Sequence, residues 1–164
     1  MKQKLKLALV GAGERGQYCY APYAKMHGYE IEFVAVADPH KGRREKFVQD
    51  YHVPAEGVFE TAEQFFARPR MADAVLICTQ DSQHYAYACQ AIDLGYSILL
   101  EKPISPSVRE CLDLQRRAEE KGTQIMVCHV MRYTKFYRKL KELIDSGVIG
   151  DVVHVTHTEN VAYW

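Results

Sequence analysis

Short apolar runs and longer amphipathic stretches alternate along the chain. The run Leu5–Val10 is apolar at five of six positions and stops at a glycine, which is typical of a strand buried on both faces. Similar runs predict strands over residues 5–10, 31–37, 72–78, 96–100 and 124–128. Helical spacing and end signals predict helices over residues 17–27, 41–51, 61–68, 83–94, 106–121 and 136–146.

Capping residues and prolines refine these helices. Pro22 lies inside the first one, which must kink there or end early. Thr61 is the expected N-cap of the third helix, and Ser105 followed by Pro106 is the expected start of the fifth. Residues 53–59 read as an irregular connection.

The regular alternation of strand and helix predicts the fold class. It is typical of an α/β protein with a parallel sheet covered by helices on both faces. We therefore predict a doubly wound Rossmann fold for residues 1–147.

The last stretch, residues 148–164, departs from this alternation. Residues 151–159 are rich in β-branched side chains, follow a glycine hinge and have no helix after them, so we expect a strand. An unpaired strand is an aggregation hazard. We expect residues 148–164 to begin a truncated second α/β domain, so that the chain is a fragment or docks on a partner there.

A glycine-rich turn follows the first predicted strand. Gly11, Gly13 and Gly16 have the spacing G-x-G-x-x-G. In a strand–turn–helix unit the first glycine permits the tight bend, the second lets a pyrophosphate approach the backbone, and the third allows close helix packing. The helix N-terminus then holds the negative charge. This pattern predicts a nucleotide site, and a glycine-rich turn without a ligand is the alternative.

An acidic residue at the end of the second predicted strand makes that nucleotide a dinucleotide. Asp38 lies 22 residues beyond Gly16, where a carboxylate accepts hydrogen bonds from the adenosine ribose. A turn aspartate before Pro39 is the alternative. A carboxylate there favours NAD. Three basic residues follow closely: Lys41, Arg43 and Arg44. They could bind the 2′-phosphate of NADP, which is the alternative cofactor, or they could form the solvated face of a helix.

Other strand-end segments should converge on the same edge of the sheet, because ligands of open parallel sheets bind beyond the carboxyl ends of the strands. They are residues 79–84, 101–103 and 129–132. Lys102 is the candidate catalytic residue, since a partly desolvated lysine there can exchange a proton with a substrate hydroxyl. For the tripeptide Glu101–Lys102–Pro103 by itself, an ordinary exposed turn is the alternative.

Composition narrows the function classes. The 164 residues are 48% hydrophobic and 26% charged with a formal net charge of zero, which gives no support for a nucleic-acid or membrane partner. No run has membrane-spanning length and no signal peptide is apparent. Five scattered cysteines predict buried, reduced thiols in a cytoplasmic protein. The histidines lack metal-ligand spacing, so we expect no metal.

Four motifs in order resemble the glucose–fructose oxidoreductase/inositol dehydrogenase (Gfo/Idh/MocA) family over nearly the whole chain. They are Gly11-Ala-Gly-Glu-Arg-Gly16, Ala37-Asp38, Thr79-x-x-x-x-His84 and Glu101-Lys102-Pro103. The resemblance implies a nicotinamide cofactor, NAD or else NADP, and a sugar, cyclitol or related polyol substrate. It also implies a homo-oligomer when the protein is full length.

The resemblance also assigns roles. The glycines would contact the pyrophosphate, Asp38 the adenosine ribose, Thr79 and His84 the nicotinamide half, and Glu101 and Lys102 the reaction centre, with Lys102 catalytic. The full set of expected cofactor-binding residues is Gly11, Gly13, Glu14, Arg15, Gly16, Asp38, Thr79, Gln80, Asp81, His84, Glu101, Lys102 and Arg132.

Two departures from the family pattern matter. Gln80 stands where the family often has proline. We therefore expect the loop that contains Gln80 to have a different conformation. Family members also continue into a second domain that supplies a further histidine and most substrate contacts. We therefore expect the 164 residues to bind cofactor without turnover.

We predict the NAD(P)-binding part of an oxidoreductase that acts on a sugar or polyol. The alternatives are an NAD-dependent glycosidase of the same family and a non-catalytic dinucleotide-binding module. S-adenosylmethionine as the ligand of the glycine turn is disfavoured by Glu101-Lys102-Pro103.

Overall fold

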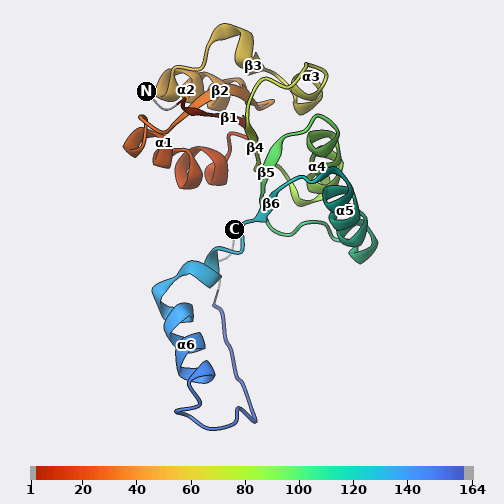
Figure 1. Cartoon of the computed structure of the whole chain (residues 1–164). Helices are drawn as coiled ribbons and strands as arrows, with labels where there is room; N and C mark the ends of the chain where they lie inside the picture. Colours follow the sequence, from red (N-terminus) through yellow and green to blue (C-terminus); the bar gives the residue numbers. More distant parts are fainter. Residues whose placement is uncertain (1–2, 161–164) are drawn as a thin grey trace. The chain divides into compact units, whose positions relative to one another are not determined.

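The structure, a computed structural model, describes residues 3–160. Six strands form one parallel sheet in the order β3-β2-β1-β4-β5-β6 (Figure 1). They are β1 Leu5–Val10, β2 Ile31–Ala37, β3 Val58–Phe59, β4 Ala74–Ile77, β5 Ser97–Leu100 and β6 Ile125–Val127. The order reverses between β1 and β4, which is the switch point where such sheets bind ligands. The predicted Rossmann fold is confirmed.

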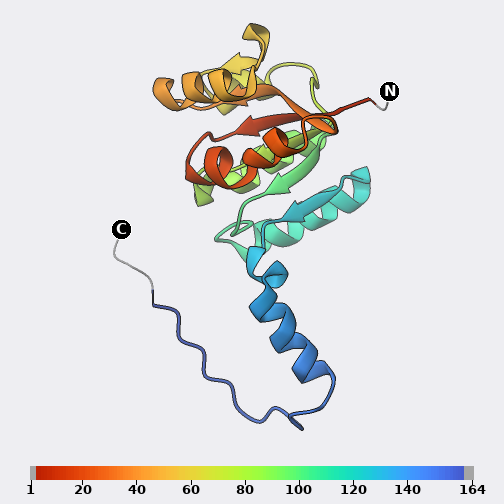
Figure 2. The same ribbon diagram turned by 90° about the vertical axis from the view of Figure 1, so that its left-hand side faces the viewer.

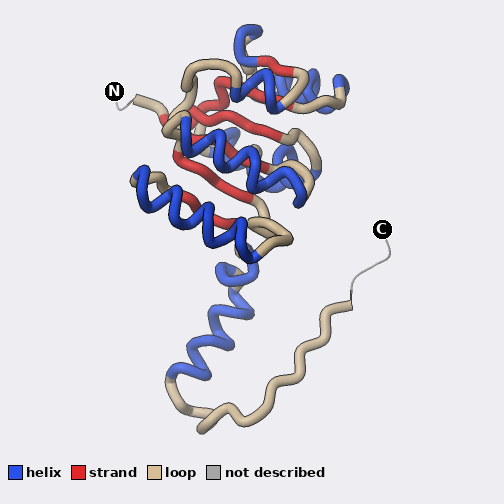
Figure 3. Tube along the Cα trace, turned by 90° about the vertical axis from the view of Figure 1, so that its right-hand side faces the viewer, coloured by secondary structure: helices blue, strands red, loops and turns tan. Residues whose placement is uncertain are grey.

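Helices cover both faces of this sheet, as Figure 3 shows. The helices α1 (Pro22–Met26) and α2 (Lys41–Tyr51) pack on one face, whereas α3 (Ala62–Phe66), α4 (His84–Asp93) and α5 (Val108–Lys121) pack on the other. Within β1, Leu7 and Leu9 belong to the hydrophobic core on the face covered by α1 and α2. Ala8 and Val10 belong to the core on the face covered by α3, α4 and α5. This alternation explains why the strand is apolar on both faces.

The first predicted helix is divided into two. A π-helix, η1 (Glu14–Tyr20), starts directly after the glycine turn, and α1 begins at Pro22 (Figure 2). The amide of Ala21 donates to the carbonyl of Gly16, five residues back, at 3.0 Å. Proline has no N–H to continue the ladder but fits the first turn of a new helix, so the break falls at Pro22.

Two predicted segments have different structures. The irregular connection 53–59 contains a 3₁₀ turn, η2 (Ala55–Gly57), and the strand β3. Two residues are too few to show a strand period, although their backbone pairs with β2. The segment 151–159 forms no strand, because a strand requires a hydrogen-bonded partner and none pairs with it among residues 3–160.

The fifth helix begins later than predicted. Its N-cap is Ser107, so Pro106 precedes the helix. The hydroxyl of Ser105 instead accepts the amide of Ser107 at 2.9 Å and donates to Glu110. Leu114 is its only buried residue, and Val108 and Leu112 on the same helix are exposed. The remaining helices and strands match the prediction to within two residues at their ends.

The chain divides into two compact units between Cys128 and His129. The second unit contains a 3₁₀ turn, η4 (Val130–Tyr133), and the predicted helix α6 (Lys135–Asp145). The apolar side chains of α6 are exposed; they are Phe136, Leu140, Leu143 and Ile144. The predicted domain boundary at residue 147 stays a prediction.

The five cysteines are all free, but burial was predicted too broadly. Only Cys128 is buried, and Cys19 is exposed because it lies on the outer side of η1. Within residues 3–160, no helix is long and apolar enough to cross a bilayer.

Candidate functional site

The residues that follow five of the strands form one row across the sheet. They are Asp38, Gly11, Cys78, Glu101 and Cys128. Each donates its amide to a carbonyl at the end of the neighbouring strand, at 2.8–3.3 Å. The hydrogen-bonded ladder therefore continues one residue past the strands. It brings together the glycine turn, Asp38 and the starts of segments 79–84 and 101–103, whereas residues 129–132 belong to the second compact unit.

The glycine turn opens this row after β1. Gly11 has a φ of +94°, and a Cβ there would lie 2.5 Å from the carbonyl oxygen of Cys78. A Cβ on Gly16 would lie 2.3 Å from the carbonyl oxygen of Gly11. Both positions therefore exclude any side chain. A Cβ on Gly13 would have as its nearest neighbour a guanidinium nitrogen of Arg43, at 3.9 Å. This space leaves the backbone open to a phosphate.

Asp38 holds the turn from the neighbouring strand. Its Oδ2 accepts the amide of Ala12 at 2.7 Å and its Oδ1 accepts the amide of His40 at 2.8 Å. The side chain is buried. A carboxylate oxygen has more than one acceptor position, so contact with a ribose hydroxyl stays a prediction. The bracing of the glycine turn is a second role that the sequence pattern did not reveal.

The three basic residues after Asp38 differ in what they contact. Lys41 is exposed and forms an ion pair with Glu45 at 3.7 Å. Arg44 is buried, donates to the backbone carbonyl of Asp38 at 2.7 Å and pairs with Glu60 at 3.3 Å. Arg43 is exposed beside the glycine turn, so it is the cation best placed to meet a phosphate.

The loop after β4 is folded inward by His84. Its Nδ1 lies 2.6 Å from the carbonyl oxygen of Pro103, and its Nε2 lies 3.2 Å from that of Thr79. Each contact requires an N–H on the ring, so the imidazolium satisfies both and the neutral ring only one. His84 is 1% exposed and joins two strand-end loops. Its predicted contact with the cofactor stays a prediction.

Two predicted residues of this loop lie on its outer side. Gln80 caps the 3₁₀ turn η3 (Asp81–Gln83), and Asp81 is its exposed first residue. The hydroxyl of Thr79, by contrast, is buried and has no hydrogen-bond partner among the described residues. An unpaired buried hydroxyl is costly, so its place beside the row of strand ends indicates a missing ligand.

Glu101 and Lys102 follow β5. Glu101 is buried, and its Oε2 accepts the amide of Lys102 at 2.9 Å. The Lys102 side chain is exposed, and its ammonium forms no hydrogen bond or ion pair with any residue between 3 and 160. The partial desolvation expected of this lysine is therefore absent here, and its charge is free to meet a ligand.

The sequence pattern missed two further residues. The hydroxyl of Tyr20, on η1, donates to Glu101 Oε1. Gln17, also on η1, is buried with its Nε2 unpartnered among residues 3–160. No sequence signal pointed to the first contact, because it joins residues 81 positions apart.

The remaining predicted residues are less constrained. Glu14 and Arg15 are exposed at the start of η1, where their backbone continues the glycine turn. Arg132 belongs to the second compact unit, so its part in the site stays a prediction. No group of three His, Cys, Asp or Glu side chains that could hold a metal occurs in the part of the chain that the structure describes.

These residues fit a dinucleotide. The open backbone at Gly13 leaves room for a pyrophosphate at a helix N-terminus, where backbone N–H groups and the helix dipole favour negative charge. The orphaned hydroxyl of Thr79 lies farther along the same edge of the sheet. The switch point of the strand order lies between them.

Comparison with known proteins decides the family. Residues 5–129 match the Gfo/Idh/MocA family, described as the oxidoreductase family with an NAD-binding Rossmann fold. The chain belongs to this family. The resemblance found in the four motifs is confirmed, and residues 5–129 are its NAD-binding domain.

Relatives within the Gfo/Idh/MocA family differ in their named reactions. The chain is 32% identical to an inositol 2-dehydrogenase from Pseudomonas syringae over 93% of this chain and 46% of that protein. It is 29% identical to a 2,7-anhydro-N-acetylneuraminate hydratase from Mediterraneibacter gnavus, over 93% of this chain and 39% of that protein. The chain thus spans about half the length of the curated relatives it matches, or less.

A solved Gfo/Idh/MocA structure agrees on the fold. The scyllo-inositol dehydrogenase from Lactobacillus casei, with bound NAD(H) and scyllo-inositol, superposes with a TM-score of 0.81 at 22% identity. The match covers 91% of this chain and 43% of that one.

Proposed function

We propose that the chain is the NAD(P)-binding part of an oxidoreductase that transfers a hydride between the cofactor and a sugar, cyclitol or related polyol. The observation that carries the proposal is the free ammonium of Lys102 at the same edge of the sheet as the glycine turn. A cation at that edge can serve a reacting hydroxyl, whereas a purely dinucleotide-binding module has no need of it.

The residues of this chain divide the work. The backbone at Gly13 and the start of η1 bind the pyrophosphate. Asp38 holds the turn and accepts hydrogen bonds from the hydroxyls of the adenosine ribose. A bound nicotinamide cofactor supplies the hydride acceptor or donor. The neutral amine of Lys102 takes a proton from the substrate hydroxyl when the substrate is oxidised, and the ammonium so formed returns it to the carbonyl oxygen when the substrate is reduced. Its ammonium also favours the developing negative charge on that oxygen.

Binding is tested on the chain itself. Thermal shift in the presence of NAD, NADP or S-adenosylmethionine should show stabilisation by a nicotinamide dinucleotide, because a ligand that binds only the folded state raises the melting temperature. Stabilisation by S-adenosylmethionine alone would overturn the cofactor assignment.

Turnover is tested on the protein in its full natural length. We expect formation of NADH or NADPH with a cyclitol or sugar, and a loss of about 100-fold or more in kcat for Lys102→Ala, the usual size of a general acid–base contribution. Lys121→Ala, at the exposed end of α5, is the matched control. A Lys102→Ala variant that keeps its rate would sink the role given to Lys102, and binding without turnover would favour a non-catalytic module.

A second candidate is favoured by the hydratase among the relatives. We infer that the same site can serve a reaction in which the sugar is oxidised and then reduced again, with no net redox change, as in an NAD-dependent glycosidase. Cofactor that copurifies at full occupancy, with product formed but no NADH released, would support it. Assembly into a homo-oligomer and a cytoplasmic location remain proposals for the complete protein.

A further inference from the structure

Tyr20 connects the glycine turn to the Glu101–Lys102 segment. It is the last residue of η1, the helix that starts at the turn. Its hydroxyl reaches across to Glu101 Oε1, while Glu101 Oε2 accepts the amide of Lys102. The carboxylate thus has one partner on η1 and one in the backbone of the candidate catalytic lysine.

The surroundings of this contact favour a fixed geometry. Glu101 is 6% exposed and the neighbouring Cys128 is buried. Burial, together with hydrogen bonds to Cys128 and Glu101, raises the pKa of Tyr20 far above its ordinary value of 10.0. The phenol therefore stays protonated at neutral pH and serves as a donor, not as a base. A hydrogen bond to a charged, buried acceptor is among the stronger ones in proteins.

We propose that Tyr20 is a positioning residue for the nicotinamide half of the site: it holds the Glu101 carboxylate, and through it the Lys102 backbone, in the geometry that meets the cofactor. This inference rests on the proposed function and adds a residue to it. The π-helical geometry of η1 supports it, since such segments frequently occur at functional sites.

Tyr20→Phe removes only the hydroxyl and tests the proposal on the 164-residue chain. We compare dissociation constants for NADH, which spans both halves of the site, and for ADP-ribose, which lacks the nicotinamide ring. We expect the affinity for NADH to fall about tenfold or more, the effect of one charge-assisted hydrogen bond. The affinity for ADP-ribose should change by less than about twofold.

Two further variants separate positioning from folding. Tyr18→Phe is the matched control, because Tyr18 lies on the same helix and is 55% exposed; it should bind both ligands as the unmodified chain does. In a Glu101→Ala background the phenol has no carboxylate to hold, so adding Tyr20→Phe should cause no further loss of NADH affinity.

The outcomes are distinguishable. If the unmodified chain binds neither ligand, the proposed function fails. If it binds both and Tyr20→Phe weakens both equally, Tyr20 only stabilises η1 and the glycine turn, and the positioning role is wrong. The same conclusion follows if Tyr20→Phe changes neither affinity, or if its effect is undiminished in the Glu101→Ala background.

Discussion

The two halves of the strand-end row are held in different ways. In the half formed by β1 and β2, the backbone conformation shapes the site: Gly11 and Gly16 leave no room for side chains, and the carboxylate of Asp38 accepts hydrogen bonds from two backbone amides. In the half formed by β4 and β5, side chains do so. There His84 bridges two carbonyls and Tyr20 holds Glu101. The first half is thus a backbone anchor, and the second depends on contacts between distant residues.

The sharpest test of the backbone anchor is Gly16→Ala. Its Cβ would lie 2.3 Å from the carbonyl oxygen of Gly11 and 2.9 Å from Leu9, and backbone cannot yield cheaply. We expect a loss of about 3 kcal/mol in unfolding free energy, measured in urea, together with loss of cofactor binding.

Gly13→Ala is the matched control for that variant. Its Cβ has open space and an ordinary φ of −79°, so the fold should be as stable as before within about 0.5 kcal/mol. NADH binding should still fail, because the methyl group occupies the approach of the phosphate. Equal stabilities for the two variants would break the distinction between a packing glycine and a binding glycine.

The second half can be broken at His84. His84→Ala removes a fully buried ring and leaves the carbonyls of Thr79 and Pro103 without a donor. We expect a loss of about 2 kcal/mol in unfolding free energy. The affinity for NADH should fall more than the affinity for ADP-ribose. His154→Ala, an exposed histidine, should change stability by less than about 0.5 kcal/mol. Equal weakening of both ligands would show that the two halves are not independent.

This division explains what the sequence could predict. The glycine spacing, the apolar strands and the position of Asp38 follow local rules, so the sequence could predict the fold and the meeting of these residues at one edge of the sheet. The contact of Tyr20 with Glu101 and the bridge made by His84 depend on which side chains meet across the sheet. The break at Pro22 was predicted only as a choice between a kink and an early end. The strand β3 was missed because two residues carry no period.

Arg43 sharpens the comparison within the backbone anchor. It lies beside Gly13, whereas Lys41 and Arg44 are paired with acidic side chains. We expect Arg43→Ala to weaken NADPH binding about tenfold and NADH binding about twofold, because an arginine contact to a 2′-phosphate is charge-assisted. Lys41→Ala should change both affinities little. If Arg43→Ala weakens both cofactors alike, Arg43 meets the pyrophosphate and does not select the cofactor.

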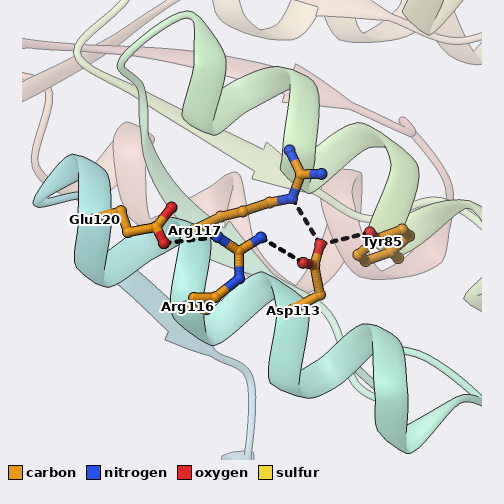
Figure 4. A network of polar contacts seen from close by, with 5 residues as sticks. All are labelled: Tyr85, Asp113, Arg116, Arg117 and Glu120. Atoms are coloured by element: carbon orange, nitrogen blue, oxygen red, sulfur yellow. Dashed lines mark hydrogen bonds and ion pairs between the residues drawn. The ribbon is translucent and has the colours of Figure 1, made fainter.

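We expect the smallest effect from a substitution at Asp113, which lies on the outer side of α4 and α5, the helices that cover the second half of the row. There Asp113 accepts hydrogen bonds from Arg116 at 2.7 Å, Arg117 at 2.6 Å and Tyr85 at 2.7 Å (Figure 4). These bonds, that of Arg116 first, hold the pKa of Asp113 well below its ordinary value of 3.8. The contacts join the two helices that cover β4 and β5.

A lowered pKa in the folded state fixes the sign of the pH dependence. The folded protein binds the proton less readily than the unfolded chain, so the stabilisation is present above about pH 4 and is lost as the pH falls below that. The melting temperature of Asp113→Asn should be slightly lower than that of the unmodified chain at pH 7, because the group is only partly buried and solvent screens its ion pairs. The difference should shrink at pH 3, and NADH affinity should not change. Asp145→Asn, an exposed aspartate on α6 with one lysine partner, is the control. A gap that widens in acid, or a loss of NADH affinity, would mean that these surface pairs also shape the side-chain half of the site.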